Sequence, residues 1–414
     1  MSSLMPNTAP RTATRPPGRK TQLLRIGSEL FAAKGYPNVS VAQIAAAAGV
    51  TAPAIYRHFP DKQAILGEAV LDAIHRLEEV TTPELTFDEF VIEMTSVTVA
   101  RPDLAVLWRW GVMHLDAQWR GPIRERSRAL LGRWTTGIRM LRPELDPEQA
   151  RMMARVMAST VSSAIVRPGR LSSAKHASML TDVVRRVMAT QLPPAAPAPS
   201  QSDEIPEEAR QDHSAAARGK AGANAGARGR REQLLGAASE LFLARGYAAV
   251  GVDELGAAVG ISGPSVYRHF PDKQAVLAAV CLRGVRRLSE QVETELGQLE
   301  GNDPGSRLRA LVRAHTSVLL SSSDLVVAAS IGSVELAGPA GQEARDFLRA
   351  HITRWSTALL QLDEDLSPAE AKVVVYAALT LANDLARGRS TRNRPHLEAE
   401  MSALMAAAVG LGPG

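Results

Sequence analysis

The chain has 414 residues, a net charge of +5, and 45% hydrophobic but only 4% aromatic residues. Two or three domains rich in helix are expected from this length and from the abundant Ala, Leu and Arg. The longest apolar stretches, such as residues 373–382, are too short to span a bilayer. Residues 1–10 lack a signal-peptide core, and the one cysteine, Cys281, has no disulfide partner. We therefore expect a cytoplasmic protein that makes no membrane contact.

Residues 1–18 form a basic N-terminal arm. Between residues 1 and 34, six Lys or Arg side chains stand against one acid, a local charge of +5. Residues 218–231 hold five cations and no acid, ending in Arg228-Gly229-Arg230-Arg231. Such clusters suit an anionic polymer, because neutralised phosphates release their counterions. Solvated arms explain charge runs equally simply. Insertion of the second cluster into a minor groove and loose attraction to phosphates both stay open.

The first predicted elements form a helix-turn-helix. A helix ending at Lys34-Gly35 has the apolar spacing of one helix face: Leu23, Ile26, Gly27, Leu30 and Phe31. A second helix starts at Ser40, and Gln43 completes a capping box. Gly49 supplies a tight turn, and Thr51 is expected to cap a short third helix. Two short helices joined by such a turn are typical of DNA-binding helix-turn-helix (HTH) units.

The third helix separates its residues by face. Ile55 and Phe59 are four residues apart and point together toward the core. The opposite face begins with small residues, Ala52 and Pro53, which let a helix approach base edges closely. Asp61 is expected to cap a fourth helix, where Lys62 in the first turn suits a phosphate.

Large side chains gather in the segment that follows, residues 71–191. They are Trp108, Trp110, Met113, His114, Trp119, Met152, Met153 and Met157. A pocket for a small apolar effector and a plain helical core both explain this gathering. The corresponding part of the second half of the chain lacks these tryptophans, so either the two pockets differ or only one is used. The candidate pocket residues are Trp110, Met113, His114, Met153, Met157, Glu335 and Asn383.

No catalytic or metal site is predicted. Ser172-x-x-Lys175 has the spacing of a β-lactamase nucleophile, but its companion motifs are missing and Ser172 suits a helix cap. Neither metal-ligand spacing nor a Ser/His/Asp or Cys/His set emerges, so we expect no cofactor and no enzyme activity.

The chain repeats itself after a linker at residues 192–227, which is rich in Pro, Ala, Gly and Ser. Residues 35–66 and 246–277 match at 18 of 32 positions, including an unbroken YRHFPDKQA. A weaker match begins at Arg133 and Arg354, offset by 221 instead of 211. Each copy is therefore divided into an HTH domain, at 19–70 and 228–281, and a longer segment that follows it, at 71–191 and 282–410. The second copy has about ten extra residues between Leu277 and Asp324.

The ordered pattern from the first helix through YRHFPDKQA resembles the DNA-binding domain of TetR-type regulators, over residues 19–70 and 230–281. The resemblance implies an all-α fold, with each HTH domain followed by a helical bundle for ligand binding and dimerisation. It also implies phosphate contacts by Tyr56, His58 and Lys62, although His58 could simply pack between helices. Ala52, Pro53 and Ala54 would touch thymine methyl groups. Ser265 replaces Ala54, so the two half-sites need not be identical.

The candidate DNA-binding residues come from both copies. In the first they are Arg19, Lys20, Thr51, Ala52, Pro53, Ala54, Tyr56, Arg57, His58 and Lys62. In the second they are Arg230, Arg231, Ser262, Gly263, Pro264, Ser265, Tyr267, Arg268, His269 and Lys273.

One chain with two HTH domains predicts a pseudo-dimer. In the family, the last two helices of the bundle form the dimer seam. The resemblance therefore implies that residues 146–167 and 172–190 of the first copy contact residues 367–387 and 395–409 of the second. We expect a regulator, a repressor released by a small lipid-like effector, that binds an imperfect palindrome in double-stranded DNA. The alternatives are a homodimer or higher oligomer and a non-inducible or architectural DNA-binding protein. The effector, the target genes and the choice between repression and activation stay open.

Overall fold

The computed structural model describes residues 18–82, 84–110, 114–166, 169, 171–193, 223–247, 249–330, 338–392 and 394–412. Within these residues every regular element is a helix, which confirms the all-α fold class. None of the helices described combines the length and apolarity needed to cross a bilayer. Residues 1–17 of the basic arm and most of the predicted linker lie outside the described residues.

Each copy begins with an HTH domain. In the first copy its elements are α1 (Arg19–Lys34), η1 (Tyr36–Asn38), α2 (Val41–Ala47), α3 (Ala52–Tyr56) and the start of α4 (Lys62–Glu79). In the second they are α10 (Ala223–Arg245), α11 (Val252–Ala258), α12 (Gly263–Val266) and the start of α13 (Lys273–Gly297). Helix α10 begins inside the predicted linker, because alanines at 223, 225 and 227 favour helix.

A helical bundle follows each HTH domain. The first contains α5 (Phe87–Ala100), α6 (Pro102–Trp110), α7 (Ala117–Leu141), α8 (Pro147–Ser162), η3 (Ser163–Ile165) and α9 (Ser173–Met188). The second contains α14 (Pro304–Ser321), α15 (Ser323–Ser330), α16 (Gly338–Leu362), α17 (Pro368–Arg387), α18 (Arg389–Arg392) and α19 (Leu397–Ala408). The extra residues of the second copy lengthen α13 and α14, which have 25 and 18 residues where α4 and α5 have 18 and 14.

The two bundles meet through α8 and α9 of the first copy and α17 and α19 of the second. We call these four helices the seam. Apolar side chains of all four are buried, among them Met153, Val184, Val375 and Met405. Polar contacts cross the seam as well. The Nζ atom of Lys175 lies 2.9 Å from Oε1 of Glu370, and Arg186 donates hydrogen bonds to the carbonyl oxygens of Ala407 and Ala408 at the end of α19.

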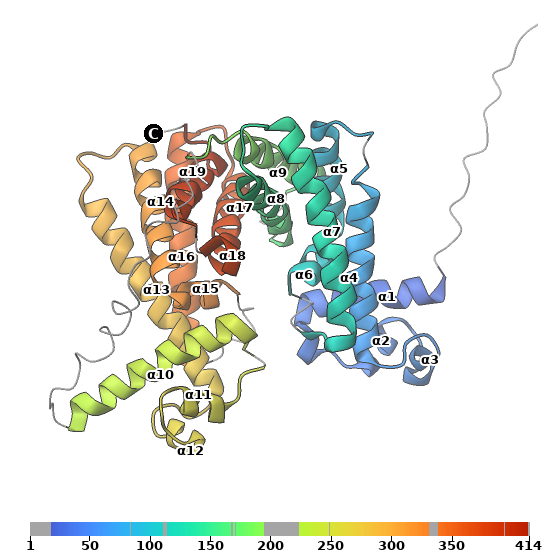
Figure 1. Ribbon diagram of the computed structural model, residues 1–414, viewed down its shortest axis with the longest axis horizontal. Coiled ribbons are helices and arrows are strands. Elements are labelled where there is room, and N and C mark those ends of the chain that lie inside the picture. Colours follow the sequence, from blue (N-terminus) through green and yellow to red (C-terminus); the bar gives the residue numbers. More distant parts are fainter. Residues whose placement is uncertain are drawn as a thin grey trace, which may run out of the picture.

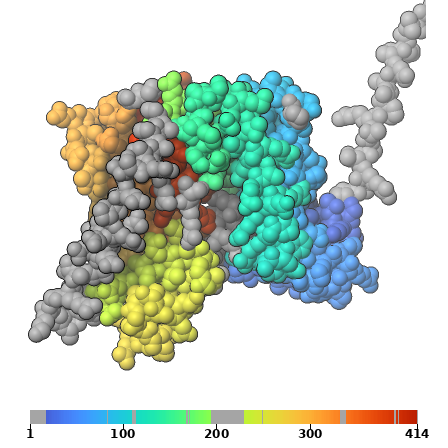
Figure 2. Space-filling model, in the orientation of Figure 1, coloured from blue at the N-terminus to red at the C-terminus, as the bar shows by residue number. Residues whose placement is uncertain are grey.

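Both HTH domains lie on the side of the molecule opposite α9 and α19. Figure 1 shows α2 and α3 at one lower corner and α11 and α12 at the other, with the seam helices in the upper middle. The space-filling view shows the two domains as separate protrusions along the same edge (Figure 2). One chain therefore presents two HTH units in the same general direction.

Candidate nucleic-acid interface

The turn of each HTH is built by local sequence. Oγ of Ser40 accepts a hydrogen bond from the backbone N–H of Gln43, and Oε1 of Gln43 accepts one from the N–H of Ser40, so the capping box is confirmed. In the second copy only the reciprocal half exists, because Gly251 has no side chain; its N–H donates to Glu254. Gly49 and Gly260 have φ angles of +66° and +70°, a conformation that favours glycine.

The third helix of each HTH is anchored by an apolar face. Ile55 and Phe59 are buried in the first copy, as are Val266 and Phe270 in the second. The tyrosine that follows Ile55 or Val266 points outward, and Tyr56 and Tyr267 are each 54% exposed. Large aromatic side chains are not usually held so far in solvent, and both copies expose this one equally. The separation of faces predicted for this helix is confirmed.

The predicted side-chain caps of the third helix are absent. Thr51 and Ser262 occupy the N-cap positions, but their hydroxyl groups cap no backbone N–H. Pro53 and Pro264 have no N–H to offer, and the N–H groups of Ala54 and Ser265 bond to the N-cap carbonyl oxygens instead. The hydroxyl of Ser262 pairs with that of Ser265 at 2.9 Å. The Thr51 and Ser262 side chains are exposed and can face a ligand outside the helix.

A lysine stands at the start of the fourth helix in both copies. Asp61 and Asp272 cap these helices through hydrogen bonds of 2.7 Å, as the sequence predicts. The Nζ atom of Lys62 lies 4.1 Å from the centre of the Tyr36 ring, and the Lys273 ammonium makes the same contact with Tyr247 at 4.3 Å. Partial burial lowers the pKa of both lysines. The tyrosine ring therefore fixes the position of the ammonium group that the first residue of each fourth helix carries.

Matching pairs of cations lie on the first helices, in the first turn of α1 and farther along α10. Arg19 and Arg230 each donate to a glutamine three residues on, and Arg230 also bonds to the carbonyl oxygen of Val259. Lys20 and Arg231 lie over the rings of Phe59 and Phe270 at 5.3 and 4.7 Å. The ring contacts place Lys20 and Arg231 beside the end of the third helix of their own HTH, whereas Arg19 bonds within α1 and Arg230 to the end of α11.

The remaining candidates sit around the same helices. Arg57, His58, Pro53, Pro264 and Arg268 are exposed. Ala52, Ala54, Ser265 and His269 are half-buried, and Gly263 is buried.

A contact between the candidate residue Gly263 and Asp253, which was not a candidate, distinguishes the second HTH. A side chain at Gly263 would overlap the carboxylate of Asp253, which lies on α11 against the start of α12. The first copy has Ala42 and Ala52 at these positions. In the alignment of the two copies, an aspartate and a glycine stand where the first copy has two alanines. This difference is the sequence signal that could have revealed the contact. Asp253 thus places a carboxylate beside α12, the third helix of the second HTH.

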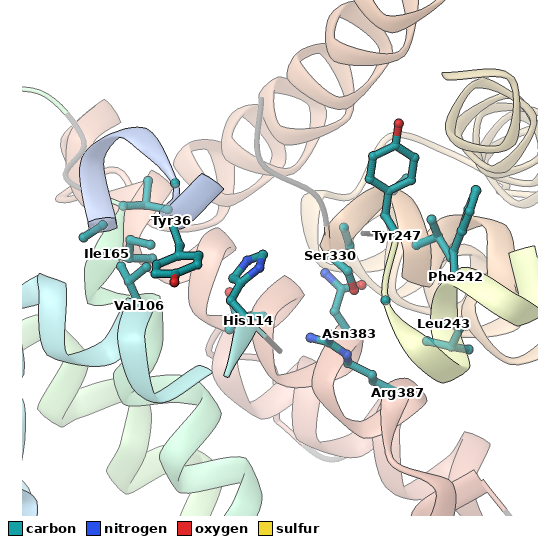
Figure 3. A pocket seen from close by; sticks show the side chains of 18 of the residues that line it. Tyr36, Val106, His114, Ile165, Phe242, Leu243, Tyr247, Ser330, Asn383 and Arg387 are labelled. Atoms are coloured by element: carbon teal, nitrogen blue, oxygen red, sulfur yellow. The ribbon is translucent and has the colours of Figure 1, made fainter. Parts of the chain in front are cut away.

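A cavity of about 570 Å³ lies between the two copies, where the HTH domains join their bundles. Tyr36, Val106, His114 and Ile165 form the wall from the first copy, and Phe242, Leu243, Ser330, Asn383 and Arg387 belong to the opposite wall (Figure 3). Two predicted pocket residues, His114 and Asn383, line this cavity. Met153 and Met157 are buried in α8 and do not line it. Met113, Glu335 and the side chain of Trp110 lie outside the described residues.

The other tryptophans of the first copy pack inside its bundle. Trp108 meets the Trp134 ring edge-on with centroids 5.9 Å apart, and its Nε1–H donates to Ser127. The Trp119 ring packs directly over Gly67 of α4, where a side chain would have no room. These two rings therefore serve the helical core, one of the two interpretations that the sequence left open.

Comparison with known proteins supports the two HTH units. Residues 23–69 and 234–280 match the family model of the bacterial regulatory proteins, tetR family. The HTH-type transcriptional activator FasR of Mycolicibacterium smegmatis is 45% identical over 85 residues, 20% of this chain and 38% of FasR. The HTH-type transcriptional repressor KstR2 of the same species is 33% identical over 64 residues, 16% of this chain and 31% of KstR2. The matches thus span well under two thirds of these relatives.

Solved structures give weaker likenesses. A TetR-family transcriptional regulator from Bordetella parapertussis has a TM-score of 0.39 at 20% identity, covering 44% of this chain and 94% of its own. AibR in complex with isovaleryl coenzyme A and operator DNA has a TM-score of 0.38 at 19% identity, covering 43% and 96%.

Proposed function

We propose that this chain, whose two HTH domains match the family model of the bacterial regulatory proteins, tetR family, is a DNA-binding transcription regulator that works as a single-chain pseudo-dimer and is released from DNA by a small apolar ligand. The observation that carries this proposal is the pair of HTH domains, each with the same Tyr-Arg-His and Lys residues around its third helix, joined by a seam inside one chain. Because the two domains differ in sequence, the operator is an imperfect palindrome.

The DNA contacts divide into two kinds. Tyr56, Lys62, Lys20 and their counterparts surround the third helix and would bind phosphates, which fixes the register of the domain on the duplex. The exposed first turn of that helix would enter the major groove. There, Ala52, Pro53 and Ala54 would contact thymine methyl groups, and Ser265 adds a hydroxyl group in the second copy.

The seam supports assembly within one chain. Its apolar core and the Lys175–Glu370 pair join helices of different copies. The Arg394 guanidinium, paired with Glu400 at 2.5 Å, has a raised pKa because of Glu400, and the carboxylates of Asp146 and Glu148 from the first copy add to the effect. Acidic groups of the first copy thus lie near enough to Arg394 of the second to stabilise its positive charge.

Helix α15 supports coupling between ligand and DNA. Its last residues, Val327 to Ser330, line the cavity. At its other end, Asp324 is buried and accepts hydrogen bonds from Arg283 and Arg287 of α13, at 2.7–2.9 Å, while Ser323 donates to Glu240 of α10 at 2.6 Å. A ligand that displaces α15 would therefore move the second HTH domain relative to the bundle, which changes the spacing of the two domains.

The test is to select genomic DNA fragments retained by the full chain and to measure affinity for the recovered sequence. We expect two related but unequal half-sites about one helical turn apart, roughly 34 Å. Recovery of a single half-site, or of fragments that share no sequence, would refute the proposal.

A further inference from the structure

The bundle of the second copy contains buried polar groups at the cavity. His315 on α14 is 3% exposed, and neither ring nitrogen has a hydrogen-bond partner among the described residues. Oδ1 of Asn383 on α17 is buried and equally unpaired. Both residues line the cavity, and Figure 3 shows Asn383 beside Ser330 and Arg387 on the wall of the second copy. Unpaired buried polar atoms are rare because they lose their hydrogen bonds to water, so a partner is expected.

A second histidine fixes the arrangement. Nε2 of His351 accepts a hydrogen bond from the indole N–H of Trp355 at 2.9 Å, which places the His351 proton on Nδ1. The His351 and His315 rings stack with centroids 5.3 Å apart. Burial lowers the pKa of His315 to about 4, and nearby Asn383 partly opposes this shift. The two ring nitrogens of His315 and Oδ1 of Asn383 nevertheless have no hydrogen-bond partner among the described residues. Burial also lowers the pKa of His351, with smaller contributions from His315 and Arg354. Both imidazoles are therefore neutral near pH 7.

The first copy has no such site. With the offset of 221 that aligns Trp134 with Trp355, the counterparts of His315, His351 and Asn383 are Met94, Leu130 and Ser162. All three are buried and none lines the cavity. The Ser162 hydroxyl is satisfied by the carbonyl oxygen of Ser159 at 2.8 Å. The corresponding space of the first bundle is thus a closed, satisfied core.

We propose that the second copy alone supplies the polar groups that hold the effector, and that the effector is an apolar molecule carrying a hydroxyl group held by His315 and Asn383. This inference rests on the proposed function and names its ligand class. A hydroxyl group can accept from an imidazole N–H and donate to Oδ1 of Asn383 at once. A ketone could only accept, which would leave Oδ1 unpaired. A carboxylate would gain no cation from either neutral imidazole and would have to be held by Arg387, which lines the same cavity but already makes an interaction within the protein. Apolar side chains of the second copy line the same cavity and suit the rest of the molecule, among them Leu325, Val327, Leu348, Ile352 and Leu379.

The experiment titrates the full chain, without DNA, with four probes of matched size: 1-dodecanol, 2-dodecanone, dodecanoate and the ring alcohol cyclododecanol. Calorimetry and melting temperature report binding. We expect at least one alcohol to bind, and to bind at least tenfold more tightly than the ketone and the carboxylate. The two alcohols distinguish an extended ligand from a ring-shaped one. If neither alcohol binds, or if the ketone or carboxylate binds as well, water alone or another chemistry satisfies these atoms and the proposal fails.

The matched variant exchanges the site for its first-copy counterpart, His315→Met with Asn383→Ser. Unliganded protein should melt at the same temperature or higher, because unpaired polar atoms are removed, while the preference for the alcohol is lost. Asn383→Ser alone gives a smaller loss and guards against a folding failure of the pair. The control, Met94→His in the first copy, should leave alcohol binding unchanged. If that change alters binding, or if the double variant still prefers the alcohol, the assignment to the second copy is wrong.

A separate measurement distinguishes this proposal from the proposed function. If the alcohol binds but leaves operator affinity unchanged, the site stands and ligand release is refuted. If a different molecule releases the operator and no alcohol binds, release stands and the site is refuted.

Discussion

The exposed residues of the two HTH domains are nearly the same, so their shared side chains are expected to contact what every DNA sequence shares, the phosphate backbone. Tyr56 and Lys62, with Tyr267 and Lys273, are the clearest examples. Among the positions that differ, Ala42, Ala52 and Ala54 against Asp253, Gly263 and Ser265 lie on or beside the third helix, where sequence preference can diverge.

Replacing Lys62 by Ala should weaken binding to all DNA sequences and reduce the slope of log affinity against log salt concentration by about 0.9, because one phosphate contact is lost. Tyr56→Phe should weaken binding roughly 2- to 10-fold, the effect of one hydrogen bond of about 0.5–1.5 kcal/mol. Filter binding over a salt series measures both. Lys372→Ala, an exposed lysine of α17 on the seam side, is the control and should change neither quantity. A change in sequence preference with an unaltered slope would show that Lys62 reads bases.

Asp253→Ala should change the preferred sequence of the second half-site only. A carboxylate beside the recognition helix accepts a hydrogen bond from cytosine N4 and repels phosphates, so its removal should weaken discrimination at one base pair by about 1–3 kcal/mol. Site selection on the wild type and the variant measures this. The paired change Ala42→Asp with Ala52→Gly should confer the same preference on the first HTH. Identical selected sequences in all three proteins would exclude Asp253 from recognition.

Ala54→Ser is a milder exchange at the same surface. It gives the first HTH the hydroxyl group of Ser265 and should shift its base preference toward that of the second half-site. Selection on the variant, with the second half-site as internal control, checks this. No change at any base would show that this position does not face the DNA.

At the residue level the sequence was informative where chemistry is local. The Ser40 box, the Asp61 and Asp272 caps and the faces of Ile55 and Phe59 depend on neighbours three or four positions away, and all are confirmed. The Thr51 cap was wrong because Pro53 has no N–H and the N–H of Ala54, the other group that a capping side chain could reach, bonds to the Thr51 carbonyl oxygen. The Asp253–Gly263 contact joins two helices and could not follow from local spacing.

At the scale of elements, the seam is the feature on which assembly depends. The helix pairs expected there from the family resemblance correspond closely to α8, α9, α17 and α19. The cavity was only partly predicted. His114 and Asn383 line it, but its walls come from both copies, and the approach of segments some 200 residues apart has no local sequence signal. Met153 and Met157 have the apolar side chains expected of a pocket wall, but both are buried in the helical core and do not line the cavity.

The Lys175–Glu370 pair gives the seam a pH dependence. Lys175 and the capping bonds of Ser367 lower the pKa of Glu370 from 4.5 to about 2. A carboxyl group with a depressed pKa in the folded state stabilises the protein above its unfolded pKa, and this contribution is lost as the pH falls from about 4.5 toward 2. Glu370→Gln keeps the capping box but not the charge. The Lys175 side chain is 57% exposed, so the contribution is small and screened by salt.

We therefore expect the stability difference between wild type and Glu370→Gln to be constant from pH 7 to about 5 and to shrink from about 4.5 downward. Urea unfolding at a series of pH values measures it. Glu364→Gln, an exposed carboxylate outside any described ion pair, serves as the control. A difference that does not vary across this range would show that the pair contributes nothing to the seam.

At the scale of the whole molecule, the duplication changes what one gene product can do. A homodimer presents two identical HTH domains, whereas this chain presents two that differ, and it can pair an HTH and a bundle specialised for different tasks. The polar residues that distinguish the copies belong to the second one. They are Asp253, beside its third HTH helix, and His315, His351 and Asn383 in its bundle. The first copy has a closed core at the corresponding positions and shares the DNA-binding surface.

The number of chains on a minimal operator tests this account most directly. Light scattering of the protein alone and on the shortest duplex that retains full affinity gives the mass of each species. A pseudo-dimer predicts one chain of 44.3 kDa per duplex, with both half-sites protected and with binding that does not depend on protein self-association. Two chains on that minimal duplex would contradict the account, since four HTH domains would then be needed where we infer two.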